Sequence, residues 1–120
     1  MASPVSVRFS RITEAKVRQI AAIERRSLAD TVKVLTEEAV RQREFPDILF
    51  ANGPTGRRAV LRNGPDIWEI LEPYIIAAKN WDLLRASYPQ LEEAQLRTAV
   101  RYYESYPEEI DARIALNQEG

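Results

Sequence analysis

The first ten residues are the part of this sequence that most constrains its fold. Val5, Val7 and Phe9 alternate with polar neighbours, and strict alternation is typical of a strand with one buried and one exposed face. Helical spacing follows at once, with apolar side chains three and four positions apart in residues 13–26 and again in residues 28–39. The sequence therefore predicts a strand followed by two amphipathic helices.

The ends of the two helices carry residues that begin and end helices. Thr13 or Ser10 can cap the first helix, because a short hydroxyl side chain accepts a hydrogen bond from the first turn. Ser27 and Asp30 resemble a capping box at the start of the second helix. We expect this helix to run to about Glu44, since proline follows at position 46.

A single strand has two unpaired edges, and a segment this short buries too little surface to fold alone. Pairing residues 5–9 with the same residues of a second chain removes both difficulties. Two such segments, paired antiparallel, form a ribbon backed by four helices. A ribbon of this size fits the major groove of DNA.

This pattern resembles the ribbon-helix-helix family of repressors and antitoxins over roughly the first 44 residues. The resemblance implies that outward strand residues contact base edges and that the start of the second helix binds phosphate. Arg8 suits the first role because a guanidinium donates two hydrogen bonds to guanine, and free amides at a helix start bind anions. The alternative is that these are ordinary solvated side chains. The expected DNA-binding residues are Ser6, Arg8, Ser10, Arg25, Arg26 and Ser27.

Composition excludes several kinds of chemistry. The chain has no Cys and no His, so disulfides, thiol nucleophiles and imidazole catalysis are excluded, and we expect no enzyme, no cofactor and no metal. No apolar run approaches 18 residues and no signal-peptide pattern is present, so we expect no membrane partner and a cytoplasmic location.

Charge is divided unevenly along the chain. The first 62 residues carry 12 basic and 7 acidic side chains, and the remainder carry 5 and 11, within a total of −1. The basic part suits contact with phosphate, whereas the acidic part suits a basic or neutral protein surface.

The middle of the chain predicts a hairpin. Turn signals at 52–56 and 63–65 flank residues 57–62, which we expect to pair as a short strand with residues 48–50. The 53–56 loop lacks the Gly-Lys-Ser/Thr ending of a phosphate-binding P-loop, so a plain turn is favoured.

Helices are expected beyond Pro65. A first one begins near Ile67 and contains Pro73, which predicts either a kink or a new helix at that point. Further helices are expected over 82–87, over 92–105 and from Pro107.

Four segments of this half, within residues 48–112, resemble the small winged-helix domain of VapB-like antitoxins. They are Gly56-Arg-Arg-Ala-Val-Leu-Arg62, Ile67-Trp-Glu-Ile70, Tyr88-Pro-Gln-Leu91 and Ala99-Val-Arg-Tyr-Tyr103. The turn after Arg62 lacks the second arginine of those relatives. The resemblance implies a PIN-like ribonuclease toxin as partner.

Helix, turn and helix over 82–105 is also the arrangement of a helix-turn-helix, which would present Gln95, Thr98, Arg101 and Tyr102 to DNA. The acidic balance of this half argues against that role. Aromatic residues are candidates for a toxin or oligomer interface, although at least two of the four are expected to be core. They are Trp68, Trp81, Tyr102 and Tyr103.

The expected fold is mainly α with short β, a ribbon-helix-helix in 1–45 and a winged-helix or helix-turn-helix-like domain in 46–120. The expected function is that of an antitoxin, which binds operator DNA as a homodimer or higher homo-oligomer and neutralises a PIN-like ribonuclease. Two alternatives are a stand-alone dimeric repressor and a protein-interaction module without DNA binding.

Overall fold

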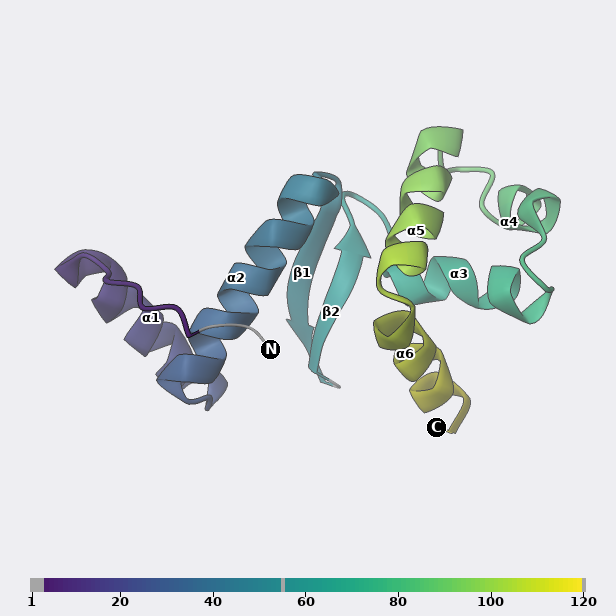
Figure 1. The fold of residues 1–120 in the computed structure, drawn as a ribbon. Coiled ribbons are helices and arrows are strands. Elements are labelled where there is room, and N and C mark those ends of the chain that lie inside the picture. The colour runs from purple at the N-terminus through teal and green to yellow at the C-terminus, as the bar shows by residue number, and fades with distance from the viewer. Residues whose placement is uncertain (1–3, 55, 120) are drawn as a thin grey trace. The chain divides into compact units, whose positions relative to one another are not determined.

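The computed structural model describes residues 4–54 and 56–119, which form helices and one small antiparallel sheet (Figure 1). This confirms the mainly α fold class with short β. No helix in these residues is long and apolar enough to cross a membrane. The elements in chain order are α1 (Arg11–Glu24), α2 (Leu28–Glu44), β1 (Ile48–Gly53), β2 (Gly56–Leu61), α3 (Ile67–Ile76), α4 (Trp81–Ser87), α5 (Glu93–Ser105) and α6 (Pro107–Glu119).

The chain divides into two compact units, Met1–Val40 and Arg41–Gly120. The division falls inside α2, rather than after residue 45 as expected from the sequence. The last turn of α2 belongs to the C-terminal unit for a physical reason. Phe45, directly after this turn, is buried in the core of that unit, and Arg41 binds Glu109 of the same unit.

Both helices of the N-terminal unit begin where the sequence predicts. The Ser10 hydroxyl accepts a hydrogen bond from the Thr13 amide at 3.2 Å, and the Ser27 hydroxyl accepts one from the Asp30 amide at 3.0 Å. Arg25 ends α1 with φ 55°, in the left-handed region. Each cap satisfies an amide that the helix itself leaves unpaired, a contribution of about 1 kcal/mol.

The predicted strand at residues 5–9 is not formed in the single chain. Residues 4–10 precede α1 without regular secondary structure, and all seven are exposed. A strand exists only through hydrogen bonds to a neighbour, and the expected neighbour is the same segment of a second chain. The ribbon therefore stays a prediction.

The predicted hairpin is confirmed. β1 pairs antiparallel with β2, from Ile48 opposite Leu61 to Gly53 opposite Gly56. Gly56 has φ 107°, a conformation that residues with a Cβ rarely adopt. Thr55, in the same turn, lies outside the described residues. The face of the hairpin that packs into the core carries Ile48, Phe50, Ala59 and Leu61.

α3 continues through Pro73 as one helix, so the alternative of a new helix starting there is wrong. Pro73 has no amide hydrogen to donate to the carbonyl of Glu69. The Tyr88 hydroxyl donates to that carbonyl instead, at 2.8 Å. A side chain beyond α4 thus replaces the hydrogen bond that proline removes.

The core of the C-terminal unit lies between the inner face of the hairpin and its helices. α3 contacts α4, α5, α6 and β2, and in Figure 1 α5 and α6 follow each other beside α3. α5 begins with a capping box of Glu92 and Gln95, near the predicted start. The fully buried side chains of this core include Ile67, Ile70, Leu71, Leu84, Leu96, Tyr102 and Ile110.

Candidate nucleic-acid interface

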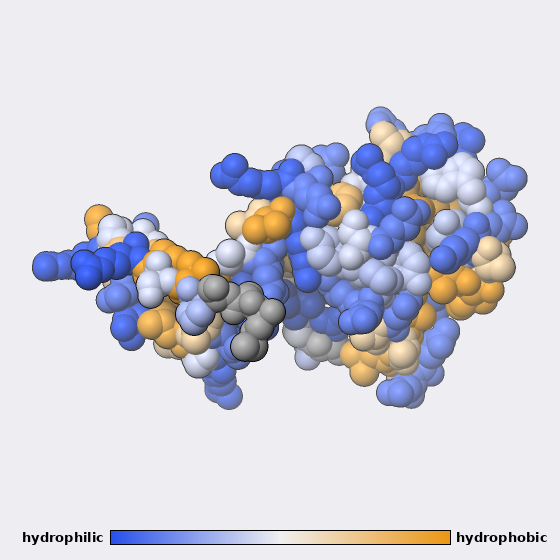
Figure 2. Space-filling view, viewed as in Figure 1, coloured by the Kyte–Doolittle hydropathy of each residue, from blue (hydrophilic) through white to orange (hydrophobic). Residues whose placement is uncertain are grey.

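The N-terminal unit buries few of its apolar side chains. Val17, Ala21 and Thr31 are its buried residues among those described. Val5 is 84% exposed, Val7 is 65% exposed and Ile23 is 73% exposed, and Figure 2 shows apolar side chains on the surface of this unit. Burying one valine or isoleucine side chain contributes about 1.5–3 kcal/mol to stability. A single chain therefore does not gain most of the stabilisation that burial of these side chains could provide.

The residues expected to contact DNA bases lie in the exposed segment that precedes α1, residues 4–10. Ser6 and Arg8 alternate with Val5, Val7 and Phe9, and all five are exposed. In an extended segment, neighbours in sequence point to opposite sides. A partner that covers the three apolar side chains therefore leaves Ser6 and Arg8 in solvent, where they can donate hydrogen bonds to a ligand.

Ser10 is placed differently from Ser6 and Arg8. Besides accepting from the Thr13 amide, its hydroxyl donates to the Thr13 hydroxyl at 3.0 Å. Both hydrogen bonds serve the start of α1. Of the two roles expected for Ser10, the cap is confirmed, and the hydroxyl is engaged within its own chain.

The second group of candidate residues is brought together at the turn between α1 and α2. Arg25 is exposed there, and the Nε of Arg26 lies 3.6 Å from Glu24. The Ser27 hydroxyl is used as the cap of α2, while its carbonyl accepts a hydrogen bond from Thr31 at 2.8 Å. The first amides of the 17-residue helix α2 lie beside these two arginines, an arrangement that is able to bind an anion.

The four aromatic candidates of the C-terminal unit separate into two pairs. Tyr102 is fully buried and Tyr103 is 9% exposed, so both are core residues. This confirms that at least two of the four are core, and it removes Tyr102 from any surface interface. Trp68 and Trp81 are partly exposed and pack against the edge of the core.

α5 does not present the surface that a recognition helix needs. Thr98 is 8% exposed and its hydroxyl donates to the Ala94 carbonyl, and Tyr102 is buried. Gln95 is held by the capping box with Glu92. Of the four residues that a helix-turn-helix would use, Arg101 alone is exposed, which weighs against DNA contact through α5.

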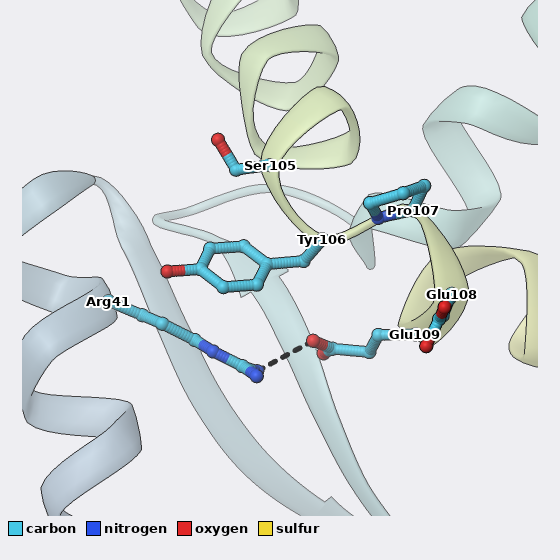
Figure 3. A pocket seen from close by; sticks show the side chains of 6 residues that line it. All are labelled: Arg41, Ser105, Tyr106, Pro107, Glu108 and Glu109. Carbon is cyan, nitrogen blue, oxygen red and sulfur yellow. Dashed lines mark hydrogen bonds and ion pairs between the residues drawn. The ribbon is translucent and has the colours of Figure 1, made fainter. Parts of the chain in front are cut away.

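An open hollow of about 400 Å³ lies where α5 meets α6 (Figure 3). Arg41 points to Glu109, with 2.6 Å between Nη1 and Oε2, and the guanidinium lies 4.3 Å from the centre of the Tyr106 ring. The Tyr102 hydroxyl accepts a hydrogen bond from Arg41 at 3.4 Å and donates to Glu109 at 3.0 Å. Burial raises the pKa of Tyr102, and the adjacent Glu109 carboxylate raises it further.

Arg41, Tyr102 and Glu109 bind one another beside this hollow, and no base is shown next to a nucleophile among these three. Among the described residues, no cluster of three or more acidic side chains is placed to hold a metal ion. The contact between Arg41 and Glu109 was not predicted, because it joins positions far apart in the chain. Comparisons with models of protein families, with curated proteins and with solved structures find no match for this chain.

Proposed function

We propose that this chain is a dimeric DNA-binding regulator of the antitoxin type, with an N-terminal ribbon-helix-helix and a winged-helix-like C-terminal unit. One observation carries the proposal. An exposed segment alternates Val5, Val7 and Phe9 with Ser6 and Arg8, and it belongs to a unit whose own buried residues are few. Antiparallel pairing of two such segments buries the apolar side chains and leaves the polar ones on one surface.

The turn between α1 and α2 supplies the second contact with DNA in this proposal. The amides at the start of α2 bind a backbone phosphate, and Arg25 and Arg26 add positive charge. Phosphate contacts fix the position of the ribbon, while Arg8 and Ser6 distinguish the bases.

Within this proposal the C-terminal unit binds a partner protein, a PIN-like ribonuclease toxin. Support comes from the acidic balance of residues 63–120 and from two partly exposed tryptophans, Trp68 and Trp81. Co-expression with the product of the neighbouring gene, followed by co-purification, tests it. If the chain copurifies with a ribonuclease whose activity falls in the complex, the antitoxin role is supported. If the chain binds DNA but has no such partner, the alternative of a stand-alone repressor is favoured.

The DNA-binding part is tested by selecting duplexes from a random pool and measuring affinity against salt concentration. Phosphate contacts predict that log affinity falls with log salt by about 0.9 per contact. If duplex binding does not depend on salt, or if no duplex binds at any salt concentration, the alternative of a protein-interaction module without DNA binding is favoured.

Arg8 gives the sharpest single variant. Arg8→Ala is expected to lower affinity for the selected duplex by about 1–3 kcal/mol and to relax base preference at one position. Arg8→Lys keeps the charge but loses the two-pronged contact, so it should retain more affinity than specificity. Arg18→Ala is the matched control, since Arg18 is also exposed but pairs with Glu14 on α1. Equal effects of Arg8→Ala and Arg18→Ala on affinity would show that Arg8 does not contact the bases.

A further inference from the structure

α2 crosses the boundary between the two units, and its two ends are held differently. Phe45, directly after the last turn, is buried, and its amide donates a hydrogen bond of 2.7 Å to the Arg41 carbonyl. The Phe45 ring packs edge-on against Tyr102, with 5.4 Å between the ring centres. Within α2 itself, Thr31 is the one buried residue. The helix is therefore fixed in a core at its C-terminal end and is largely uncovered along the rest of its length.

Side-chain contacts also hold the last turn of α2. Arg41 binds Glu109, and Figure 3 shows the guanidinium pointing to that carboxylate. The Tyr106 hydroxyl donates a hydrogen bond to the Glu44 carboxylate at 2.9 Å. All four residues belong to the C-terminal unit. The turn is thus held by contacts made entirely within that unit.

The remainder of α2, residues 28–40, is a weak helix by its own composition. Branching at Cβ restricts side-chain rotamers in a helix, and β-branched residues recur in this segment. They are Thr31, Val32, Val34, Thr36 and Val40. A helix of this length is marginal in water if it must nucleate by itself, because the first turn fixes several residues for one hydrogen bond. Once a turn exists, each added residue gains its own hydrogen bond, so residues 28–40 are ordered more readily from an existing turn.

We propose that the last turn of α2 is the nucleus of the whole helix, so that in the single chain α2 is ordered from Phe45 toward Ser27. In a free helix nucleation is unfavourable by a factor of about 10⁻³, and here the contacts of the C-terminal unit supply the first turn. The use of this device rests on the proposed function. If two chains pair through their N-terminal segments, α2 is already helical before they meet, and preorganisation of this kind favours association.

Hydrogen exchange of the α2 amides, followed by mass spectrometry, tests the direction of ordering. The full chain carries Val7→Asp to prevent pairing of N-terminal segments, at a concentration where sedimentation velocity gives the single-chain mass of 13.8 kDa. Ala39→Gly and Ala29→Gly are matched variants, since both alanines are exposed in α2. Ala39→Gly is expected to speed exchange of residues 32–38 about fivefold, because glycine weakens their connection to the nucleus. Ala29→Gly is expected to leave residues 34–44 unchanged.

Three results would overturn the inference. Equal acceleration along all of α2 in both variants would show that the helix opens as one unit. Acceleration by Ala29→Gly that reaches residues 34–44, with the effect of Ala39→Gly confined to its own turn, would show that the N-terminal unit holds the helix. Unprotected amides at residues 32–38 before either glycine is introduced would show that the last turn does not order the rest.

The exchange of α5 amides, which both glycine variants should leave unchanged, shows that the C-terminal unit stays folded. If Ala39→Gly alters that exchange, Ala39→Ser replaces it, because serine is less unfavourable than glycine within a helix. No step of this measurement involves DNA. Failure of the proposed function would appear separately, as a lack of duplex binding by the unchanged chain.

Discussion

Two consecutive residues between α3 and α4 hold a conformation that their side chains disfavour. Ala78 has φ 56° and Lys79 has φ 62°, in the left-handed region. The turn is kept by a hydrogen bond of 2.7 Å from the Lys79 amide to the Tyr74 carbonyl. A residue with a Cβ costs about 1–2 kcal/mol in this region, and glycine avoids that cost.

Ala78→Gly is therefore expected to raise the free energy of unfolding. The gain is reduced by the greater freedom of glycine in the unfolded chain, which leaves about 0.5–1 kcal/mol. Urea denaturation followed by tryptophan fluorescence measures it. Ala86→Gly, at an exposed position of α4, is the control and should destabilise, since glycine is unfavourable within a helix. Destabilisation by Ala78→Gly would contradict the left-handed turn.

At the scale of elements, α3 depends on a contact from outside itself. Tyr88→Phe removes the donor to the Glu69 carbonyl that Pro73 leaves unpaired, and we expect a loss of about 1 kcal/mol in the free energy of unfolding. In a Pro73→Ala background the new amide supplies that hydrogen bond, so the same change should cost less. A double-mutant cycle measures the difference, and equal costs in both backgrounds would show that Tyr88 acts elsewhere.

The end of α2 is joined to the start of α6 by a buried phenol. The pKa of Tyr102 is raised above its ordinary value of 10.0 by burial and by Glu109. The folded state therefore holds the proton more tightly than the unfolded state. The contribution of protonated Tyr102 to the free energy of unfolding is complete below about pH 10 and is lost as pH rises above that value.

Tyr102→Phe should consequently make stability less sensitive to alkali. It removes the group whose ionisation favours the unfolded chain, although at neutral pH it also deprives Glu109 of a donor and lowers stability. Urea midpoints measured between pH 7 and pH 11 test this. If the urea midpoint of Tyr102→Phe falls above pH 10 as steeply as that of the unchanged protein, other tyrosines are responsible for the sensitivity to alkali.

The sequence predicted elements whose signals are local. The cap at Ser27, the end of α2 before Pro46 and the hairpin turn at Gly56 each depend on neighbouring residues. Distant contacts were not predicted. The unit boundary within α2 follows from Arg41 binding Glu109, and the continuity of α3 through Pro73 follows from Tyr88. Neither partner is marked by spacing or residue type.

For the whole molecule, the account depends on whether two N-terminal segments pair. Positions 5–9 are exposed in the single chain, so we expect cysteine substitutions there to leave its fold unchanged. The chain contains no cysteine of its own, and each variant therefore carries one thiol. A disulfide forms where two Cα atoms lie about 4.4–6.8 Å apart.

The most direct test is a series of variants that each carry one cysteine, at position 5, 6, 7, 8 or 9. Each variant is oxidised under identical conditions, and monomer is then separated from cross-linked dimer without reductant. Antiparallel pairing predicts cross-linked dimer with a maximum at one position, on the two-fold axis, and a fall on both sides. Thr13→Cys, on α1, should cross-link weakly. Equal cross-linking at all five positions would indicate parallel pairing, and cross-linking no stronger than that of Thr13→Cys would contradict the paired ribbon altogether.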